Sequence, residues 1–289
     1  MQYLDREGKI CGGETFQDRL LLKMYSTLPG RMALSLFIRP CISKAGGYLL
    51  NTEISKVLIK PFIKSNNIEL DDYEKKEFDS YNDFFIRQIK KDLRPVDMSE
   101  DVLISPCDSK LSVFKIDDRS QLFIKNTYYT VKSLLRSSSL SKKYEGGTAM
   151  VFRLSVDDYH RFCYPDAGIR GEGKRINGVF HSVNPVANDK RPIYKENTRE
   201  YCILRSENFG DILMMEVGAL MVGKIVNYHG RGDVLKGQEK GRFEFGGSTV
   251  VLLFERGRIL PDQDILENSE NGYETKVKMG EKIGLKSAE

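Results

Sequence analysis

Residues 242–254 constrain the chain most, because they predict two strands separated by a double glycine. Residues 242–245 alternate polar and aromatic side chains, and residues 250–254 form an apolar run typical of a buried strand. Gly246, Gly247 and Ser248 stand between them, and paired glycines in a strand pattern mark a bend or a close backbone approach. Such a bend would bring the Ser248 hydroxyl beside the Gly247 carbonyl, in a position to attack its own preceding peptide bond. The same residues also fit an ordinary glycine bulge with a solvated serine.

Length, charge and cysteine usage narrow the class of protein. The 289 residues suit one large domain or two closely joined ones, and 40% hydrophobic residues are enough to build a core. A net charge of +4 is too small to indicate a nucleic-acid partner. The five cysteines are scattered without a CxxC pair, which argues against a disulfide framework and for a reducing compartment. Without a signal pattern or a run of about 18 apolar residues, the chain is expected in the cytosol with no membrane span.

The N-terminal part of the chain divides into a polar start and an apolar, basic stretch. Residues 1–20 are polar and are expected to be loosely held, whereas prolines and glycines divide the apolar residues 20–63 into short helices. Residues 21–64 carry seven Lys or Arg and one acid, Glu53. Basic amphipathic helices with bulky apolar faces can lie on an anionic bilayer surface. The alternative is a helical layer packed on the core of the protein.

Beyond residue 80 the pattern changes to short strands with regular turn signals. Ser80 and Asp83 resemble a capping box, and the helix that follows is expected to end at Arg94 and Pro95. We therefore divide the chain into an N-terminal helical region, residues 1–79, and a β-rich region, residues 80–289. The expected fold is α+β, with N-terminal amphipathic helices on a mostly antiparallel β core and a second helical stretch near 131–143. The expected strands are 102–104, 111–114, 121–124, 149–154, 178–183, 200–205, 212–217, 220–226 and the two around Ser248.

Candidate catalytic side chains are few. The three histidines are His160, His181 and His229, and Asp108 lies in a turn between two expected strands. A serine nucleophile needs a base to take its proton and often a carboxylate to orient that base, a set that Asp108, a histidine and Ser248 could supply. The GxSxG pattern of α/β-hydrolases is absent. The histidines and cysteines lack the spacing of a metal site, so no metal is expected.

Seven groups of motifs resemble those of the phosphatidylserine decarboxylase family, in the family's order. They cover roughly residues 80 to 285, and although each is short, the ordered set is specific. The resemblance identifies residues 80–289 as a catalytic region. The motifs are Asn82–Arg87 with Arg94 and Pro95, Ser105–Asp108, Asp158–Phe162, Ser182–Pro185, Val217–Ala219 with Val222 and Gly223, Lys236–Gly241, and Gly247–Thr249.

The resemblance implies a self-processing enzyme that converts phosphatidylserine to phosphatidylethanolamine and CO2. Such proenzymes cleave themselves before the motif serine, here between Gly247 and Ser248, and a heterodimer of chains 1–247 and 248–289 results. Ser248 would become a pyruvoyl group, whose ketone forms a Schiff base with the lipid's serine amine and accepts electrons when CO2 leaves. No external cofactor is then needed. Together with the basic helices, the resemblance implies peripheral binding to an anionic surface on the cytoplasmic side of the cell membrane.

Matching positions give roles to three residues under this resemblance. Ser248 is similar to the family's nucleophile, Asp108 to its charge-relay aspartate, and His160 to the first histidine of a Tyr-His-Arg motif that handles substrate or a proton. The chain departs from the family at Cys163, where a second histidine usually serves as the relay base, and at Ser109, where glycine is usual.

The missing relay histidine leaves two candidates for the base of self-cleavage, His160 and His181. His181 directly precedes the motif Ser182–Pro185. If residues 149–162 and 176–183 pair as neighbouring strands, His181 could project into the space vacated at position 163, and Asp108 would orient it. In the alternative, His160 serves both steps and His181 is a surface or core residue.

Two other functions are compatible with the sequence. A processing-dead paralogue that acts as a lipid-binding or scaffold protein would stay as one intact chain without a ketone. A conventional serine hydrolase would keep a free Ser248 hydroxyl and react with serine-directed phosphonates. We favour the decarboxylase because Gly247, Ser248, Asp108 and His160 are all retained.

Overall fold

The computed structural model describes residues 2–13, 16–124, 127–219, 224–246 and 248–288. In these ranges short strands dominate the chain after residue 100, as the sequence predicts. The strands are β1 (Gln2–Leu4), β2 (Ile10–Gly12), β3 (Val102–Ile104), β4 (Ser109–Lys115), β5 (Gln121–Ile124), β6 (Thr127–Thr130), β7 (Thr148–Leu154), β8 (Arg161–Cys163), β9 (Gly168–Arg170), β10 (Lys174–Ile176), β11 (Arg199–Ser206), β12 (Asp211–Val217), β13 (Lys224–Asn227), β14 (Gly232–Val234), β15 (Glu239–Glu244), β16 (Ser248–Phe254), β17 (Ile259–Pro261), β18 (Thr275–Val277) and β19 (Lys282–Lys286).

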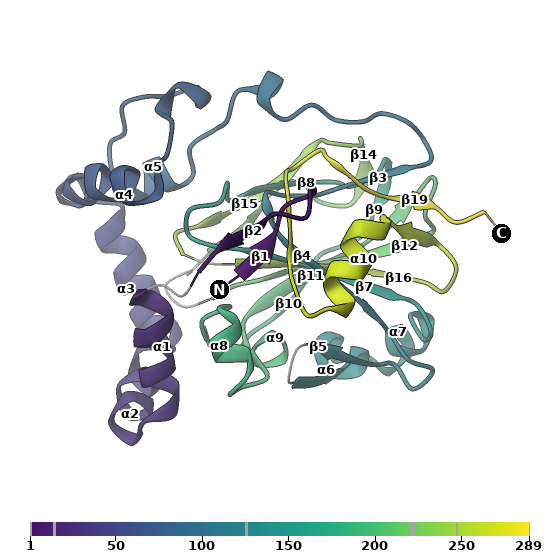
Figure 1. Ribbon diagram of the computed structural model, residues 1–289, viewed down its shortest axis with the longest axis horizontal. Coiled ribbons are helices and arrows are strands. Elements are labelled where there is room, and N and C mark those ends of the chain that lie inside the picture. Colours follow the sequence, from purple (N-terminus) through teal and green to yellow (C-terminus); the bar gives the residue numbers. More distant parts are fainter. Residues whose placement is uncertain (1, 14–15, 125–126, 220–223, 247, 289) are drawn as a thin grey trace.

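One eleven-stranded sheet forms the centre of the molecule (Figure 1). Its order is β14-β9-β11-β12-β16-β7-β4-β18-β1-β2, with β10 paired to β11. Its pairs are antiparallel except β1 with β18. Two three-stranded sheets, β13-β15-β8 and β17-β19-β3, and the hairpin β5-β6 complete the β core.

β16 is the central strand around which the core packs. Val251 pairs with Met215 of β12 on one side and with Val151 of β7 on the other. Every residue of β16 is buried, because other parts of the chain cover both faces of the sheet at this strand. This burial explains why the sequence shows a continuous apolar run here instead of an alternating one.

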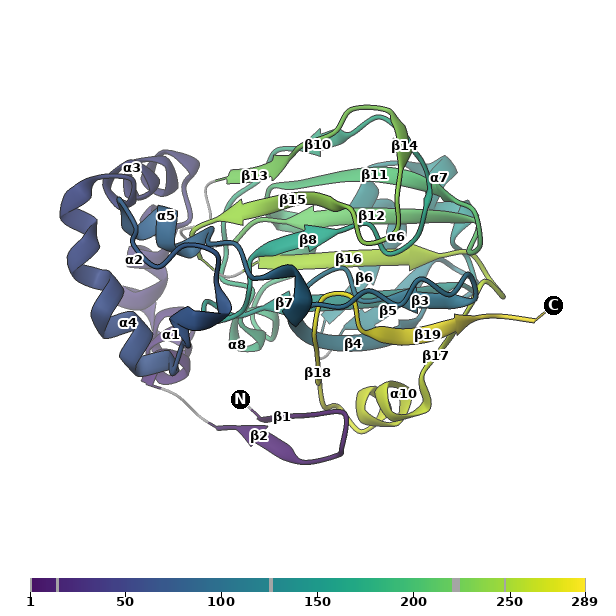
Figure 2. The same ribbon diagram turned by 90° about the horizontal axis from the view of Figure 1, so that it is seen from above.

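The N-terminal helices lie together at one end of the β core, and both ribbon views agree on this position (Figures 1 and 2). Thr27 caps α2 through a hydrogen bond from Gly30 N–H, and a left-handed Asn67 ends α4. The observed α+β architecture therefore agrees with the prediction. The α-helices are α1 (Phe16–Ser26), α2 (Leu28–Phe37), α3 (Pro40–Leu50), α4 (Ile59–Asn66), α5 (Tyr81–Phe85), α6 (Val131–Leu135), α7 (Ser138–Lys143), α8 (Pro185–Asn188), α9 (Ile193–Glu196) and α10 (Gln263–Glu270), and a 3-10 helix spans Glu53–Leu58.

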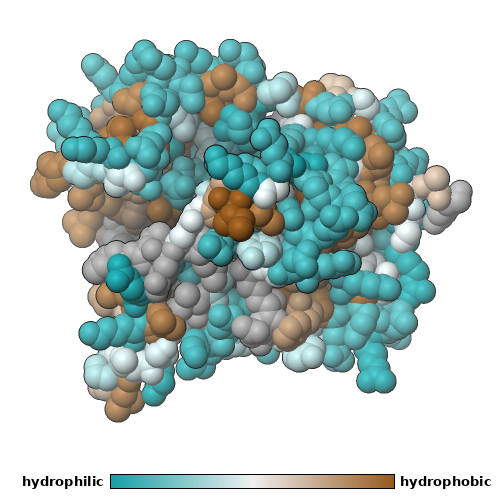
Figure 3. Space-filling view, in the orientation of Figure 1, coloured by the Kyte–Doolittle hydropathy of each residue, from teal (hydrophilic) through white to brown (hydrophobic). Residues whose placement is uncertain are grey.

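The same helices expose an unusual number of large apolar side chains. Figure 3 shows hydrophobic patches over this end of the molecule. Meanwhile Leu21, Tyr25 and Leu34 point inward and are buried in the main core. The helical layer is thus anchored to the core on one face and apolar on the other. The exposed residues are Leu20, Leu22, Leu28, Met32, Leu36, Phe37, Ile42, Tyr48, Leu49, Ile54, Val57 and Leu58.

Two expectations for the N-terminal half were wrong. Residues 2–12 are not loosely held, because β1 pairs with β2 and with β18 of the central sheet. The helix after Ser80 ends at Phe85, well before Arg94. Residues 88–90 instead pair with residues 72–74, through Glu74 N–H to the Gln88 carbonyl and Lys90 N–H to the Asp72 carbonyl, both at 2.9 Å. This tertiary pairing replaces the local helical hydrogen bonds that the pattern predicts.

Two expected strands also differ from the structure. Residues 178–183 form no strand, and within them only Val179 makes an isolated bridge, to Asn197. In the expected strand 220–226, residues 220–223 lie outside the described residues and β13 begins at Lys224.

Candidate active site

Ser248 begins β16, and Phe245 and Gly246, shortly before it in the chain, have left-handed backbone. The Ser248 side chain is fully buried, and its backbone pairs with Leu154 of β7. Phe245 has φ of 34° and Gly246 has φ of 107°. A positive φ is strained for phenylalanine and is maintained only when the surroundings hold it. The Phe245 ring is held by Tyr81 and Phe85, at centroid distances of 5.2 and 5.4 Å. Gly247, the residue predicted to precede the cleaved bond, lies outside the described residues.

His160 faces the Ser248 hydroxyl. The distance from His160 Nδ1 to Ser248 Oγ is 3.3 Å, and His160 Nε2 lies 2.9 Å from the Ser155 carbonyl oxygen. Because a carbonyl oxygen can only accept, Nε2 carries the proton and Nδ1 is the acceptor for the Ser248 hydroxyl. This is the arrangement of a base that receives the proton of a nucleophilic serine.

Burial keeps His160 in its neutral form. The side chain is fully enclosed and stacks on the Phe85 ring, with the centroids 4.2 Å apart. Burial lowers the pKa of His160 to about 3. The hydrogen bond to Ser155 raises this pKa, whereas the positive charge of Arg87 lowers it further. At pH 7, His160 is therefore an uncharged acceptor.

A buried ion pair holds the turn that presents the Ser155 carbonyl. Lys110 Nζ lies 2.8 and 2.7 Å from the two carboxylate oxygens of Asp158. Asp158 Oδ2 in turn accepts the Ser155 N–H at 2.7 Å. Lys110 and Asp158 thus position the carbonyl that sets the tautomer of His160. The sequence analysis missed Lys110 and Ser155; a lysine inside the otherwise buried strand β4 was the available signal.

Asp108 lies in a turn, as predicted, but its partners are not histidines. Arg94 Nε donates to Asp108 Oδ1 at 2.8 Å, Arg94 Nη2 donates to the other oxygen, and the Met279 N–H donates at 2.8 Å. Within the described chain no hydrogen bond joins Asp108 to His160 or to Ser248. The expected relay through Asp108 is therefore not assembled in this structure, and a catalytic role for Asp108 stays a prediction.

Cys163 lies against the turn that carries Asp108, because its N–H donates to the Pro106 carbonyl at 2.8 Å. Its thiol is buried in a small cluster that Met279 joins, and Met279 is also the residue whose N–H binds Asp108. Burial raises the pKa of the Cys163 thiol to about 12, so the thiol stays protonated and is a poor base. The usual position of the family's relay histidine thus lies beside the aspartate, but a neutral thiol occupies it.

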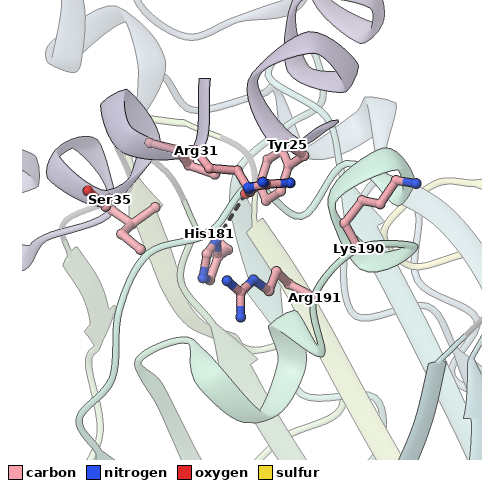
Figure 4. Close-up of a pocket in the computed structure, with 8 residues that line it drawn as sticks. Tyr25, Arg31, Ser35, His181, Lys190 and Arg191 are labelled. Carbon is pink, nitrogen blue, oxygen red and sulfur yellow. Dashed lines mark hydrogen bonds between the residues drawn. The ribbon is translucent and has the colours of Figure 1, made fainter. Parts of the chain in front are cut away.

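His181 lies in a different environment from His160, against helix α1 (Figure 4). Its Nδ1 is 3.1 Å from the Tyr25 hydroxyl, and its Nε2 is 3.3 Å from Glu196 Oε2. The pairing of residues 149–162 with 176–183 was wrong, because β7 pairs with β4 and β16 while β10 pairs with β11. The structure therefore brings Ser248 together with His160 and not with His181.

Arg87 is a further charged side chain near the site that the sequence analysis did not single out for a role. It is buried, and its guanidinium lies over the Tyr73 and Phe84 rings, with hydrogen bonds to the Phe84 carbonyl and the Tyr73 hydroxyl. Among the described residues no carboxylate pairs with it, and its Nε has no partner. Its position two residues after Phe85 explains its effect on the pKa of His160.

The described residues contain neither a metal-binding cluster nor a membrane-spanning helix. No group of three or more His, Cys, Asp or Glu side chains in these residues is arranged to hold a metal ion. No helix in the described ranges combines the length and apolar character that crossing a bilayer requires.

Comparisons with known proteins point to one family. The family model described as phosphatidylserine decarboxylase matches residues 81–285. The chain is 49% identical to phosphatidylserine decarboxylase proenzyme 2 of Clostridium acetobutylicum over 262 residues, which is 90% of each chain. It is 46% identical to the proenzyme of Clostridium tetani over 83% of this chain and 82% of that one. It is 43% identical to the proenzyme of Clostridium kluyveri over 99% of both. A match of this extent to the family model and to these relatives shows that the chain belongs to the phosphatidylserine decarboxylase family.

Proposed function

We propose that this chain cleaves itself between Gly247 and Ser248 and, as a pyruvoyl-dependent enzyme, decarboxylates phosphatidylserine to phosphatidylethanolamine. The observation that carries the proposal is the 3.3 Å contact between His160 Nδ1 and Ser248 Oγ. Family membership supports the activity, since the relatives are named as phosphatidylserine decarboxylase proenzymes. The proenzyme family implies a pyruvoyl group, and we propose that it derives from Ser248.

Self-cleavage begins with proton transfer between Ser248 and His160. The hydroxyl proton moves to His160 Nδ1 while Oγ attacks the carbonyl carbon of Gly247, and the Ser248 nitrogen leaves with a proton, so that an ester replaces the peptide bond. Loss of the Ser248 Cα proton then expels the Gly247 carboxylate, and water converts the resulting dehydroalanine into the pyruvoyl group and ammonia. Backbone strain at Phe245 favours the overall cleavage, because the chain end that the elimination frees can relax.

The residues around position 248 fit a pyruvoyl group. Residues 249–253 are hydrogen-bonded to β7 on one side and β12 on the other, which would hold position 248 in place after the bond to Gly247 breaks. The group supplies a ketone that takes up the amine of the lipid serine and withdraws the electrons released with CO2. The proposal needs no external cofactor.

His160 also has a role in the decarboxylation under this proposal. Among the described titratable side chains, it is the one that hydrogen-bonds to residue 248. The Phe85 ring stacked on it excludes water from this side of the imidazole. We infer that His160 Nδ1 takes a proton from the substrate's ammonium group as the amine adds to the ketone, and then delivers that proton to the substrate carbon from which CO2 has left.

The N-terminal helices are proposed to dock the enzyme on the cytoplasmic side of the cell membrane, as a peripheral protein. Their exposed face carries the apolar residues listed above, and residues 21–64 carry seven Lys or Arg and one acid. Each basic side chain near an anionic surface contributes about 1 kcal/mol, so several suffice for reversible binding alongside apolar insertion.

Intact-mass measurement of the purified protein tests the chemistry. The wild-type chain should give two masses, with the small chain, residues 248–289, blocked by a pyruvoyl group that borohydride reduces. Ser248→Ala and His160→Gln should remain full-length, while His181→Gln should mature at the wild-type rate. A wild-type preparation that stays as one intact chain without a ketone would instead identify a processing-dead lipid-binding protein.

A further inference from the structure

A second candidate binding site lies between the N-terminal helices and the β core, and Ser248 does not line it. It is a cavity of about 360 Å³, within the range of small-ligand pockets. Figure 4 shows six of its lining residues, which come from α1, α2 and the segment 181–191. They are Tyr25, Arg31, Ser35, His181, Lys190 and Arg191. Ser248, His160, Phe85 and Phe245 are not among the residues that line it.

Three positively charged side chains are among the residues that line this cavity. Arg31, Lys190 and Arg191 are exposed, so the cavity opens to solvent between them. Within the described residues, no carboxylate lies at ion-pair distance from any of the three; Arg31 has only a weak 3.5 Å contact with the Ser26 carbonyl. Unpaired guanidinium groups are suited to bidentate binding of phosphate oxygens.

Between these cations, Tyr25 and His181 are held in place by hydrogen bonds and are uncharged at neutral pH. The Ser182 N–H donates to the Tyr25 oxygen, the Tyr25 hydroxyl faces His181 Nδ1, and His181 Nε2 faces Glu196. Burial raises the pKa of Tyr25 to about 12 and, together with the charge of Arg191, lowers the pKa of His181 to about 4. The Glu196 carboxylate lies 3.3 Å from His181 Nε2, and among the described residues it makes no ion pair with Arg31, Lys190 or Arg191.

The cavity lies beside the exposed apolar face of helix α2. Arg31 and Ser35 line the cavity, while Met32 and Leu36, the next residues along the helix, are 66% and 55% exposed. A lipid whose acyl chains contact Met32 and Leu36 would bring its phosphate next to Arg31. A free anion would gain nothing from this neighbouring apolar surface.

We propose that this cavity binds the phosphate of an anionic membrane phospholipid, at a site separate from the reaction centre. The site rests on the proposed membrane docking, because its ligand is presented by a bilayer. It would fix the orientation of the helical layer on the membrane surface, whereas scattered surface charge attracts the protein without orienting it.

A charge-matched pair of variants tests the site. Arg31→Gln with Arg191→Gln removes two arginines from the cavity, and Arg19→Gln with Arg39→Gln removes two exposed arginines of the helical region that do not line it. Both variants lose the same charge, so general attraction to the bilayer weakens equally. Binding is measured by flotation with vesicles of phosphatidylcholine containing phosphatidylglycerol. The cavity variant should lose about ten-fold or more in affinity, and the control about three-fold or less.

Further measurements distinguish free phosphate from lipid phosphate. They also distinguish failure of this site from failure of membrane docking or of self-cleavage. Inorganic phosphate at millimolar concentration should leave the melting temperature and the vesicle binding of the wild-type chain unchanged. If phosphate instead abolishes the difference in vesicle binding between the two variants, the site binds free phosphate and the lipid proposal is overturned. Ser248→Ala should bind vesicles like the wild type, which keeps this test independent of self-cleavage. Equal weakening of the two variants would overturn the site alone, and no vesicle binding by any of the proteins would overturn the site and membrane docking together.

Discussion

At the scale of single residues, the site is defined by the protonation of His160. Its Nε2 proton is engaged by the Ser155 carbonyl, and its Nδ1 faces Ser248. Such an imidazole can accept the serine proton only while it is uncharged, and burial keeps it uncharged over a wide pH range. The two departures from the family, at Cys163 and Ser109, leave this pair intact.

The pH dependence of self-cleavage should therefore be flat in weakly acidic solution. With its pKa lowered from 6.5 to about 3, His160 stays neutral from pH 8 to pH 5, and the fraction of active base is unchanged. A base with the ordinary pKa of 6.5 would lose about thirty-fold in rate at pH 5. The appearance of the small chain over time, measured by mass spectrometry at each pH, distinguishes these outcomes. A loss of about thirty-fold in the self-cleavage rate at pH 5 would show that another group, or a less buried His160, is the base.

Asp108 should be needed for stability more than for chemistry. Removing one partner of the largely buried Arg94–Asp108 pair leaves the other charge uncompensated, so Asp108→Asn and Arg94→Gln should each lower the free energy of unfolding by about 3 kcal/mol. Denaturant unfolding measures this change, and both variants should mature at the wild-type rate once folded. If Asp108→Asn blocks maturation while Arg94→Gln does not, Asp108 is the relay carboxylate that the resemblance implies.

At the scale of elements, the N-terminal helices have one face packed on the core and one exposed apolar face. One face is buried through Leu21, Tyr25 and Leu34, and the opposite face exposes apolar side chains that the β core does not cover. Contiguous exposed apolar surface on a soluble domain usually marks an interaction site. The sequence left open whether these helices pack on the core or bind a membrane, and the burial pattern is compatible with both at once.

Charged substitutions on the exposed face should weaken membrane binding without changing the fold. Met32→Glu with Leu36→Glu places two carboxylates on α2 at positions that are mostly exposed, so the melting temperature should stay within a few degrees. Vesicle affinity should fall about ten-fold, because apolar insertion is lost and negative charge is added. Met98→Glu is the control, since Met98 is 65% exposed but lies outside these helices. Equal vesicle binding by all three proteins would show that another surface docks.

At the scale of the whole molecule, the proposed cleavage divides a single sheet. The small chain would supply β16, β17, α10, β18 and β19. β16 lies between β7 and β12, and β18 lies between β4 and β1, so that two strands of the small chain are enclosed by strands of the large chain. The products should therefore remain one folded unit.

This arrangement predicts that the matured protein behaves as a stable heterodimer of its own two chains. Gel filtration in native buffer should give one peak that contains both chains, because separation would break the hydrogen bonds of β16 on both sides and expose its apolar residues. In about 6 M guanidinium chloride the two chains should elute separately. A small chain that elutes alone in native buffer would contradict the prediction.

The sequence by itself determined the fold class and the family, and it predicted Ser248 as the reactive serine. Local patterns suffice for these: the apolar run 250–254 predicted the buried strand, and Gly247-Ser248 within an ordered set of motifs predicted the processing site. Only the tertiary structure decided which histidine meets Ser248, because His160 and His181 both stand in motifs and their distance in space depends on strand pairing. The same reason explains the partners of Asp108, the Lys110–Asp158 pair and the cavity beside α2. Each joins segments far apart in the chain, and no local pattern encodes which distant segments pack together.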